Sequence, residues 1–93
     1  MRHRHYSPRA TVVIADGSSG AITTDGAAFI GLTKPKTAFR KAYICDSVEQ
    51  YAHRLFEFFR ECDREGVSVI CCEPVEESGI GAALMDRLRR AAE

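Results

Sequence analysis

The side chains best suited to chemistry stand together at the start of the chain, in the segment RHRHYSP. Arg4, His5 and Tyr6 supply a permanent cation, an imidazole that titrates near neutral pH and a phenol within three residues. Pro8 holds the backbone extended just after them. Such a strip could lie across a neighbouring surface and present its polar ends to a nucleotide or a carboxylate. The alternative is an ordinary frayed terminus.

A second set of candidates follows the predicted strands. Ligands of open parallel sheets bind in the loops past the carboxyl ends of the strands. In this chain those loops offer a ligand site made of Ser47, Glu73, Gly79 and Gly81. The two glycines open a helix whose first N–H groups could hold an anion. A glycine pair at a helix entry more often serves a tight turn, and charged loop residues are usually only solvated.

The remaining polar residues carry no catalytic signature. Ser18 and Ser19 lack the G-x-S-x-G elbow that activates a nucleophilic serine, and no histidine pattern supports them. The turn Lys34-Pro35-Lys36 could bind phosphate or be a simple exposed turn. We therefore expect no catalytic residue in this domain.

The four cysteines are predicted to be structural. None forms a CxxC pair, and each lies within an apolar pattern. In a chain without a secretion leader, buried free thiols are expected rather than disulfides or a zinc site. We therefore expect no metal.

Length and charge exclude several classes. The 93 residues suffice for one small domain, and Lys and Arg (13) balance Asp and Glu (13). A general nucleic-acid binder would show a basic excess. No apolar run approaches the roughly 18 residues of a membrane span, so we expect no membrane partner.

Hydrophobic periodicity predicts the elements that position these candidates. The apolar run 10–15 reads as a strand buried on both faces, and Ile80, Leu84, Leu88 and Ala91 form the predicted buried face of the last helix. A Ser47–Gln50 capping box marks the predicted start of the long helix, and Gly66 marks its predicted end. The predicted strands are 10–15, 27–32, 41–45 and 67–72, and the predicted helices are 48–65 and 79–93.

The long helix and its flanking strands form a βαβ unit with parallel strands. The connection over 16–26 is rich in glycine and lacks helical periodicity, so the direction of the first three strands stays open. The pattern predicts an α/β domain around a mostly parallel sheet of about four strands.

Motifs at both ends of the chain resemble one family, the two-domain L-threonylcarbamoyladenylate synthases, in their C-terminal domain. The motifs are Met1-x-x-x-His5-Tyr6-x-Pro8, Glu73-Pro74-Val75, Gly79-Ile80-Gly81 and Asp86-Arg87-Leu88. The resemblance implies an interdomain linker tail over residues 1–9. It also implies a small Rossmann-like, three-layer regulatory domain over residues 10–93.

The family resemblance also implies a function. These enzymes are nucleotidyltransferases that convert threonine, bicarbonate and ATP into threonylcarbamoyl-AMP, for threonylcarbamoyladenosine in tRNA. Catalysis belongs to an N-terminal YrdC-like domain, which would be the partner of this chain in the cytoplasm and would hold ATP and Mg²⁺. This domain would hold no cofactor. A contact with tRNA would be indirect or is left open by the resemblance. The linker residues Arg4, His5, Tyr6 and Pro8 would help to close the catalytic cleft.

Two other functions stay open. One is a free-standing small-molecule sensor that uses the loops at the strand ends. The other is an RNA-contact module that uses the arginines near the two ends of the chain, which are Arg2, Arg4, Arg9, Arg87, Arg89 and Arg90.

Overall fold

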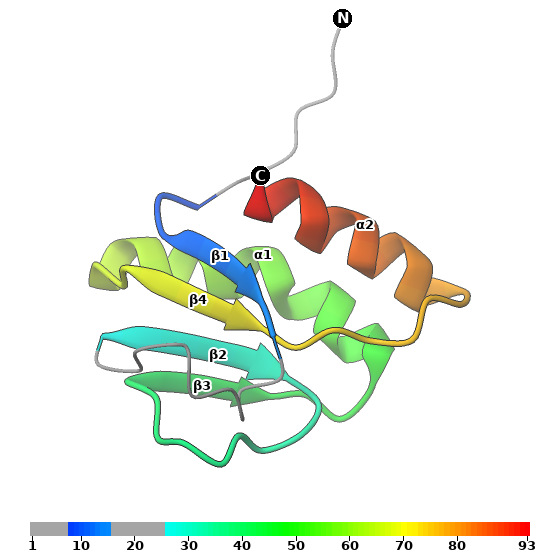
Figure 1. Cartoon of the computed structure of the whole chain (residues 1–93), viewed down its shortest axis with the longest axis horizontal. Coiled ribbons are helices and arrows are strands. Elements are labelled where there is room, and N and C mark those ends of the chain that lie inside the picture. The colour runs from blue at the N-terminus through cyan, green and yellow to red at the C-terminus, as the bar shows by residue number, and fades with distance from the viewer. Residues whose placement is uncertain (1–7, 16–25) are drawn as a thin grey trace, which may run out of the picture.

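The computed structural model describes residues 8–15 and 26–93, which form one sheet and two helices (Figure 1). The elements in chain order are β1 (Thr11–Ile14), β2 (Ala27–Gly31), β3 (Lys41–Ile44), α1 (Val48–Glu65), β4 (Val69–Cys72) and α2 (Ile80–Ala92). Each lies within a predicted range, and α1 has the predicted bounds.

The four strands are all parallel and lie in the order β1-β4-β2-β3. This confirms the α/β class and settles the direction of the first three strands. The strands that flank α1 in the sequence, β3 and β4, run parallel as predicted, with β2 between them.

Strand burial follows position in the sheet. Every residue of β2 is buried. β2 has a neighbouring strand on each side, the helices cover Ala28 and Ile30, and the Phe39 ring lies against Phe29 on the other face. The prediction that the first strand is buried on both faces was wrong. β1 is an edge strand in which Val12 is buried while Val13 and Ile14 are only half-buried.

Both helices pack against the same face of the sheet (Figure 1). Val12, Ile30 and Ile70 of the sheet meet Leu55 of α1 and Leu88 of α2 in one hydrophobic core. On the other face, the rings of Phe29 and Phe39 lie with their centroids 5.4 Å apart. In the described residues, the third layer expected from the resemblance is thus the irregular segment 32–40 rather than a helix.

The predicted capping residues mark the two ends of α1. The Ser47 hydroxyl accepts a hydrogen bond from Gln50 N–H at 3.1 Å, and the Gln50 side-chain oxygen accepts one from Asp46 N–H at 2.6 Å. Gly66 ends the helix in the left-handed conformation, with φ of 72°.

The predicted buried face of α2 needs one correction. Leu84 and Leu88 are buried as expected and Ala91 is half-buried against the core, but Ile80 is 49% exposed. Gly81 and Met85 are buried in its place. The segment that enters α2 packs on the Gly81 side of the first turn, and neighbouring residues of a helix point about 100° apart. Ile80 therefore points into solvent.

Candidate functional site

The parallel sheet brings the ends of its strands to one edge, which we call the carboxyl edge. Leu32 and Thr33 follow β2, Cys45 to Ser47 follow β3, and Glu73 follows β4. The topology thus collects the predicted loop residues Ser47 and Glu73 at the same edge. The hydrogen bonds of Ser47 and Glu73 show whether their polar groups remain available to a ligand.

Glu73 uses its side chain inside the protein. One oxygen of its carboxylate accepts hydrogen bonds from the N–H of Leu32 at 2.6 Å and of Thr33 at 2.9 Å. The backbone N–H of Glu73 donates to the Ile30 carbonyl at 3.0 Å. Glu73 therefore ties the end of β4 to the turn after β2, and that carboxylate oxygen is committed to backbone donors.

Ser47 is likewise engaged, as the N-cap of α1. Tyr51 links it to Glu73, because the Tyr51 N–H donates to the Ser47 carbonyl at 3.0 Å and the Tyr51 hydroxyl donates to the Glu73 carbonyl at 2.7 Å. Burial is the main cause that raises the pKa of Tyr51 well above its ordinary value. The phenol thus stays protonated and works as a structural donor.

The glycines Gly79 and Gly81 shape the entry of α2. Gly79 has φ of 59° and ψ of −128°, a conformation that favours glycine. A Cβ at Gly81 would overlap the carbonyl of Glu76 and lie 3.5 Å from Val75 Cγ2. The backbone conformation at Gly79 and the packing at Gly81 each explain why glycine stands there. Ligand binding by the group of Ser47, Glu73, Gly79 and Gly81 stays a prediction.

Of the four predicted linker residues, the structure describes only Pro8. Arg4, His5 and Tyr6 lie outside the described residues. Pro8 is described and buried, and the N–H of the following Arg9 donates to Asp63 at 3.0 Å. Because Pro8 precedes β1, it lies at the amino edge of the sheet, opposite the carboxyl edge. The structure does not bring Pro8 together with the predicted loop residues.

The four cysteines are free and buried, as predicted. Burial raises the pKa of the Cys45 thiol to about 11 and that of the Cys62 thiol to about 11, and it raises the pKa of Cys72 further. These thiols stay protonated near neutral pH, so they are poor nucleophiles and poor metal ligands. In the described ranges, no three His, Cys, Asp or Glu side chains converge as metal ligands would.

The basic residues near the chain end have partners. Arg89 pairs with Glu77, Arg90 pairs with Asp86 at 3.1 Å, and the Arg87 guanidinium lies 5.7 Å from the centroid of the Phe56 ring. Two of these three arginines are thus paired with carboxylates inside the domain, while Arg87 keeps its charge beside the Phe56 ring.

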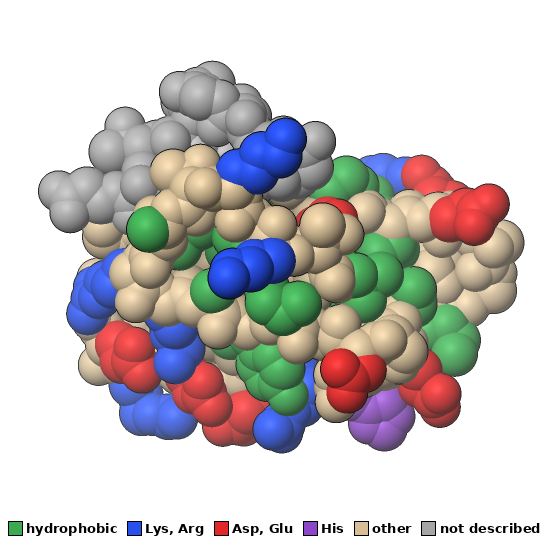
Figure 2. Space-filling view, turned by 90° about the horizontal axis from the view of Figure 1, so that it is seen from below, with side chains coloured by type: hydrophobic (Ala, Val, Ile, Leu, Met, Phe, Trp, Pro, Cys, Tyr) green, Lys and Arg blue, Asp and Glu red, His purple; other side chains and the backbone are tan. Residues whose placement is uncertain are grey.

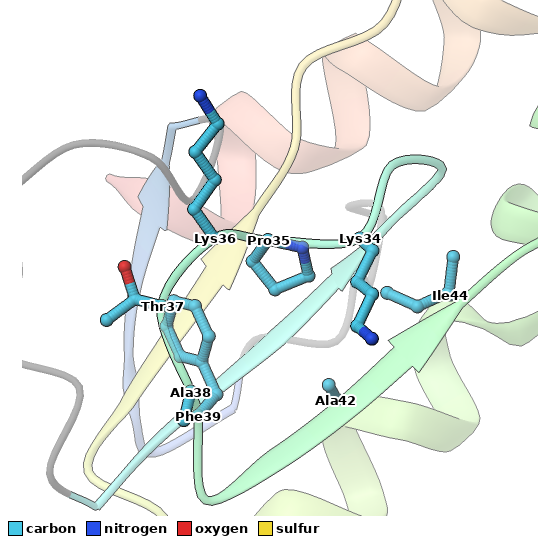
Figure 3. Close-up of a pocket in the computed structure, with 8 residues that line it drawn as sticks. All are labelled: Lys34, Pro35, Lys36, Thr37, Ala38, Phe39, Ala42 and Ile44. Atoms are coloured by element: carbon cyan, nitrogen blue, oxygen red, sulfur yellow. The ribbon is translucent and has the colours of Figure 1, made fainter.

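Sequence reasoning missed a pocket on the sheet face opposite the helices (Figure 3). It has a volume of about 340 Å³ and lies under the segment 34–39, beside β3. The sequence indicates the turn Lys34-Pro35-Lys36 as a possible phosphate contact but not the apolar side chains beside it. The alternation of Ala42 and Ile44 with Lys41 and Tyr43 was the available signal.

The described helices are too short or too polar for any of them to span a membrane.

Comparison with known families gives a match along the chain. The family model described as threonylcarbamoyl-AMP synthase, C-terminal domain, matches residues 1–93. The threonylcarbamoyl-AMP synthase of Pyrococcus abyssi is 36% identical over 104 residues, which cover 99% of this chain and 31% of that protein. The Bacillus subtilis enzyme of the same name is 28% identical over 110 residues, with coverage of 99% and 31%.

Solved structures of P. abyssi Sua5 also resemble this chain in fold. The crystal structure of P. abyssi Sua5 complexed with L-threonine matches with a TM-score of 0.76 at 33% identity, covering 99% of this chain and 31% of that one. A variant of P. abyssi Sua5, with a histidine and the adjacent tyrosine replaced by alanine, matches with a TM-score of 0.73 at 32% identity. That match covers 91% of this chain and 28% of the variant. The chain thus spans 31% of the length of the curated relatives it matches.

Proposed function

Because the chain belongs to the threonylcarbamoyl-AMP synthase C-terminal domain family, we propose that it is the accessory domain of an enzyme that makes threonylcarbamoyl-AMP. The enzyme would use threonine, bicarbonate and ATP, and its product would serve tRNA modification in the cytoplasm. The observation that carries the proposal is the match over residues 1–93 to proteins of which the chain spans 31%.

The chemistry itself is assigned to the rest of such an enzyme, a YrdC-like N-terminal domain. The described residues do not suit Mg²⁺, because no cluster of carboxylates converges in them. One oxygen of the Glu73 carboxylate is committed to backbone donors, and the Cys45 and Cys62 thiols have pKa values raised by burial. ATP and Mg²⁺ would therefore be held by the N-terminal domain.

The linker would close the catalytic cleft. Buried Pro8 and the hydrogen bond from Arg9 N–H to Asp63 give the end of the linker a fixed base on this domain. From that base, Arg4, His5 and Tyr6 would reach the partner domain. A P. abyssi relative was solved with an adjacent histidine and tyrosine replaced by alanine, the same pair of residue types as His5-Tyr6.

Closure would matter because the product is a mixed carbamate–phosphate anhydride, which water hydrolyses. A lid that excludes water prevents this side reaction. It also positions the reacting groups, and a misplaced contact can cost about 100-fold in rate.

The test is a pair of measurements on the double variant His5→Ala, Tyr6→Phe. In the 93-residue chain, thermal unfolding should stay unchanged. In a two-domain enzyme that carries this chain as its C-terminal part, turnover should fall, or hydrolysed intermediate should accumulate relative to threonylcarbamoyl-AMP.

The matched control is His3→Ala, which removes a histidine from the same segment but lies outside the His-Tyr-x-Pro motif. It should leave both measurements unchanged. If the double variant lowers the stability of the isolated chain but leaves the turnover of the enzyme unchanged, the linker has only a structural role. That result would refute cleft closure.

A further inference from the structure

The pocket lies on the helix-free face of the sheet and involves none of the residues of the predicted loop site or linker. Ile44, at the end of β3, forms the pocket wall nearest the carboxyl edge. The pocket is formed where the connection between β2 and β3 returns across the sheet. Its lining residues are Lys34, Pro35, Lys36, Thr37, Ala38, Phe39, Ala42 and Ile44. A volume of about 340 Å³ suits a small molecule, since ligand pockets begin at roughly 300 Å³.

The walls of this pocket are mainly apolar. Ala42 and Ile44 alternate along β3 and face away from the helices, and Ile44 is 38% exposed. The Phe39 ring is held in place by its contact with Phe29 in the buried strand β2. Figure 2 shows hydrophobic side chains gathered on the face seen from below, with Lys or Arg side chains among them. These side chains offer apolar contacts to a ring bound in the pocket.

The pocket also carries positive charge without a carboxylate. The lining contains two lysines and no acidic residue. Several other described cations have carboxylate partners, for example Lys41 with Glu61 and Glu65 at 3.3 Å each. In the described part of the chain, neither Lys34 nor Lys36 lies within ion-pair distance of a carboxylate.

The two lysines are arranged differently (Figure 3). The Lys34 side chain runs from the loop toward Ala42, on the side where Ile44 lies, whereas the Lys36 side chain extends away from these residues. An anion held in the pocket would therefore meet Lys34, while Lys36 would contribute only to the surrounding field.

We propose that this pocket binds a small amphipathic anion. Its apolar body would lie against Phe39, Ala42 and Ile44, and its carboxylate or phosphate would pair with Lys34. The inference goes beyond the proposed function, because it concerns a ligand of this domain and does not depend on which reaction the N-terminal part performs.

Four probes test the chemistry on the ¹⁵N-labelled 93-residue chain: phenylacetate, phenyl phosphate, benzyl alcohol and benzylammonium. Amide chemical shifts are followed by NMR at constant ionic strength. We expect saturable shifts at residues 34–44 with one or both anions, and at most weak shifts with the neutral and cationic probes. The tighter of the two anions identifies the ligand as a carboxylate or a phosphate.

Two matched lysine variants and one variant that fills the pocket test the geometry. Lys34→Gln should weaken binding of the tighter anion roughly tenfold, because a charge-assisted contact inside the pocket is lost. Lys36→Gln removes the same charge from the same loop and should weaken it less than about twofold, since an exposed and distant charge is screened by salt. Ala42→Leu should abolish binding by filling the pocket, with thermal unfolding as the check on its fold.

Four results would overturn the proposal. Absence of saturable shifts with both anions would remove the site. Equal weakening by Lys34→Gln and Lys36→Gln, or equal affinity for benzyl alcohol and the anions, would remove the Lys34 contact. Shifts at residues 34–44 that follow protein concentration alone would mean that a second copy of the chain covers this face.

Discussion

The side chain of Glu73, at the end of β4, fills the space in which Gly31, at the end of β2, would carry its own. A Cβ placed on Gly31 would lie 2.6 Å from Glu73 Cβ and 2.9 Å from Phe29 Cζ. Both separations are shorter than real Cβ contacts allow. The hydrogen bonds from Leu32 and Thr33 to the Glu73 carboxylate therefore depend on glycine at position 31.

Gly31→Ala should destabilise the domain by about 1–3 kcal/mol, the usual cost of overpacking a filled site. Urea unfolding measures the change. A double-mutant cycle with Glu73→Ala is the control, because removing the Glu73 side chain relieves part of the clash. The double variant should lose less than the sum of the single losses, and strict additivity would contradict the contact.

Glu73→Ala should cost about 1–3 kcal/mol in the free energy of unfolding, because the partly buried N–H of Leu32 loses its acceptor. Glu73→Gln keeps a side-chain oxygen and should cost less. Glu76→Ala, in the same loop but exposed, should change stability by less than about 0.5 kcal/mol. Equal losses for Glu73→Ala and Glu76→Ala would show that the carboxylate does not hold the turn.

Phe58→Ala and Phe59→Ala should each cost roughly 3–5 kcal/mol, because both rings are buried between α1 and the sheet. Phe56→Ala, at a half-buried position of the same helix, should cost less. Chemical unfolding of the three variants gives the comparison. Losses below about 1 kcal/mol for both buried rings would disprove the assignment of this face to the core.

The buried thiols predict a pH dependence. Cys45 and Cys62 have pKa values raised from 9.0 to about 11 by burial, so the folded chain keeps these protons while the unfolded chain releases them. Stability should be full below pH 9 and should fall by about 1.4 kcal/mol per pH unit for each thiol as pH rises toward 11.

Urea unfolding between pH 8 and pH 11, compared with that of Cys45→Ala, isolates one thiol. The variant should show a shallower loss than the parent chain over the window from 9.0 to about 11. An identical slope would mean that the Cys45 thiol ionises equally easily in the folded state.

The isolated chain should make no threonylcarbamoyl-AMP from threonine, bicarbonate and ATP. Its described residues bring no metal-ligand cluster together, and the Cys45 and Cys62 thiols stay protonated. Pyrophosphate release by the purified chain is the measurement, with an intact two-domain relative as the positive control. Pyrophosphate release above background would refute the assignment of catalysis to the N-terminal part.

Local chemistry made much of the fold predictable. The Ser47–Gln50 cap and Gly66 fix the ends of α1 through contacts within a few residues, so the sequence predicted its bounds. The carboxyl edge could also be predicted, because parallel strands end on the same side whatever their order. The motifs at the two ends of the chain indicated the family that the comparisons then showed.

Strand order, layer arrangement and the use of each polar group were decided by tertiary structure. The run 10–15 is apolar enough for a central strand, yet β1 lies at the edge because β2 and β4 pair with each other. From the sequence, Glu73 was a candidate ligand residue. In the fold, the N–H groups of Leu32 and Thr33, about 40 residues away in the chain, donate to its carboxylate. The pocket has the same origin, since the loop after β2 encloses it only once that loop packs across β3. Side-chain spacing along one chain cannot encode which distant backbone donors will meet a carboxylate, because that depends on how separate elements pack together.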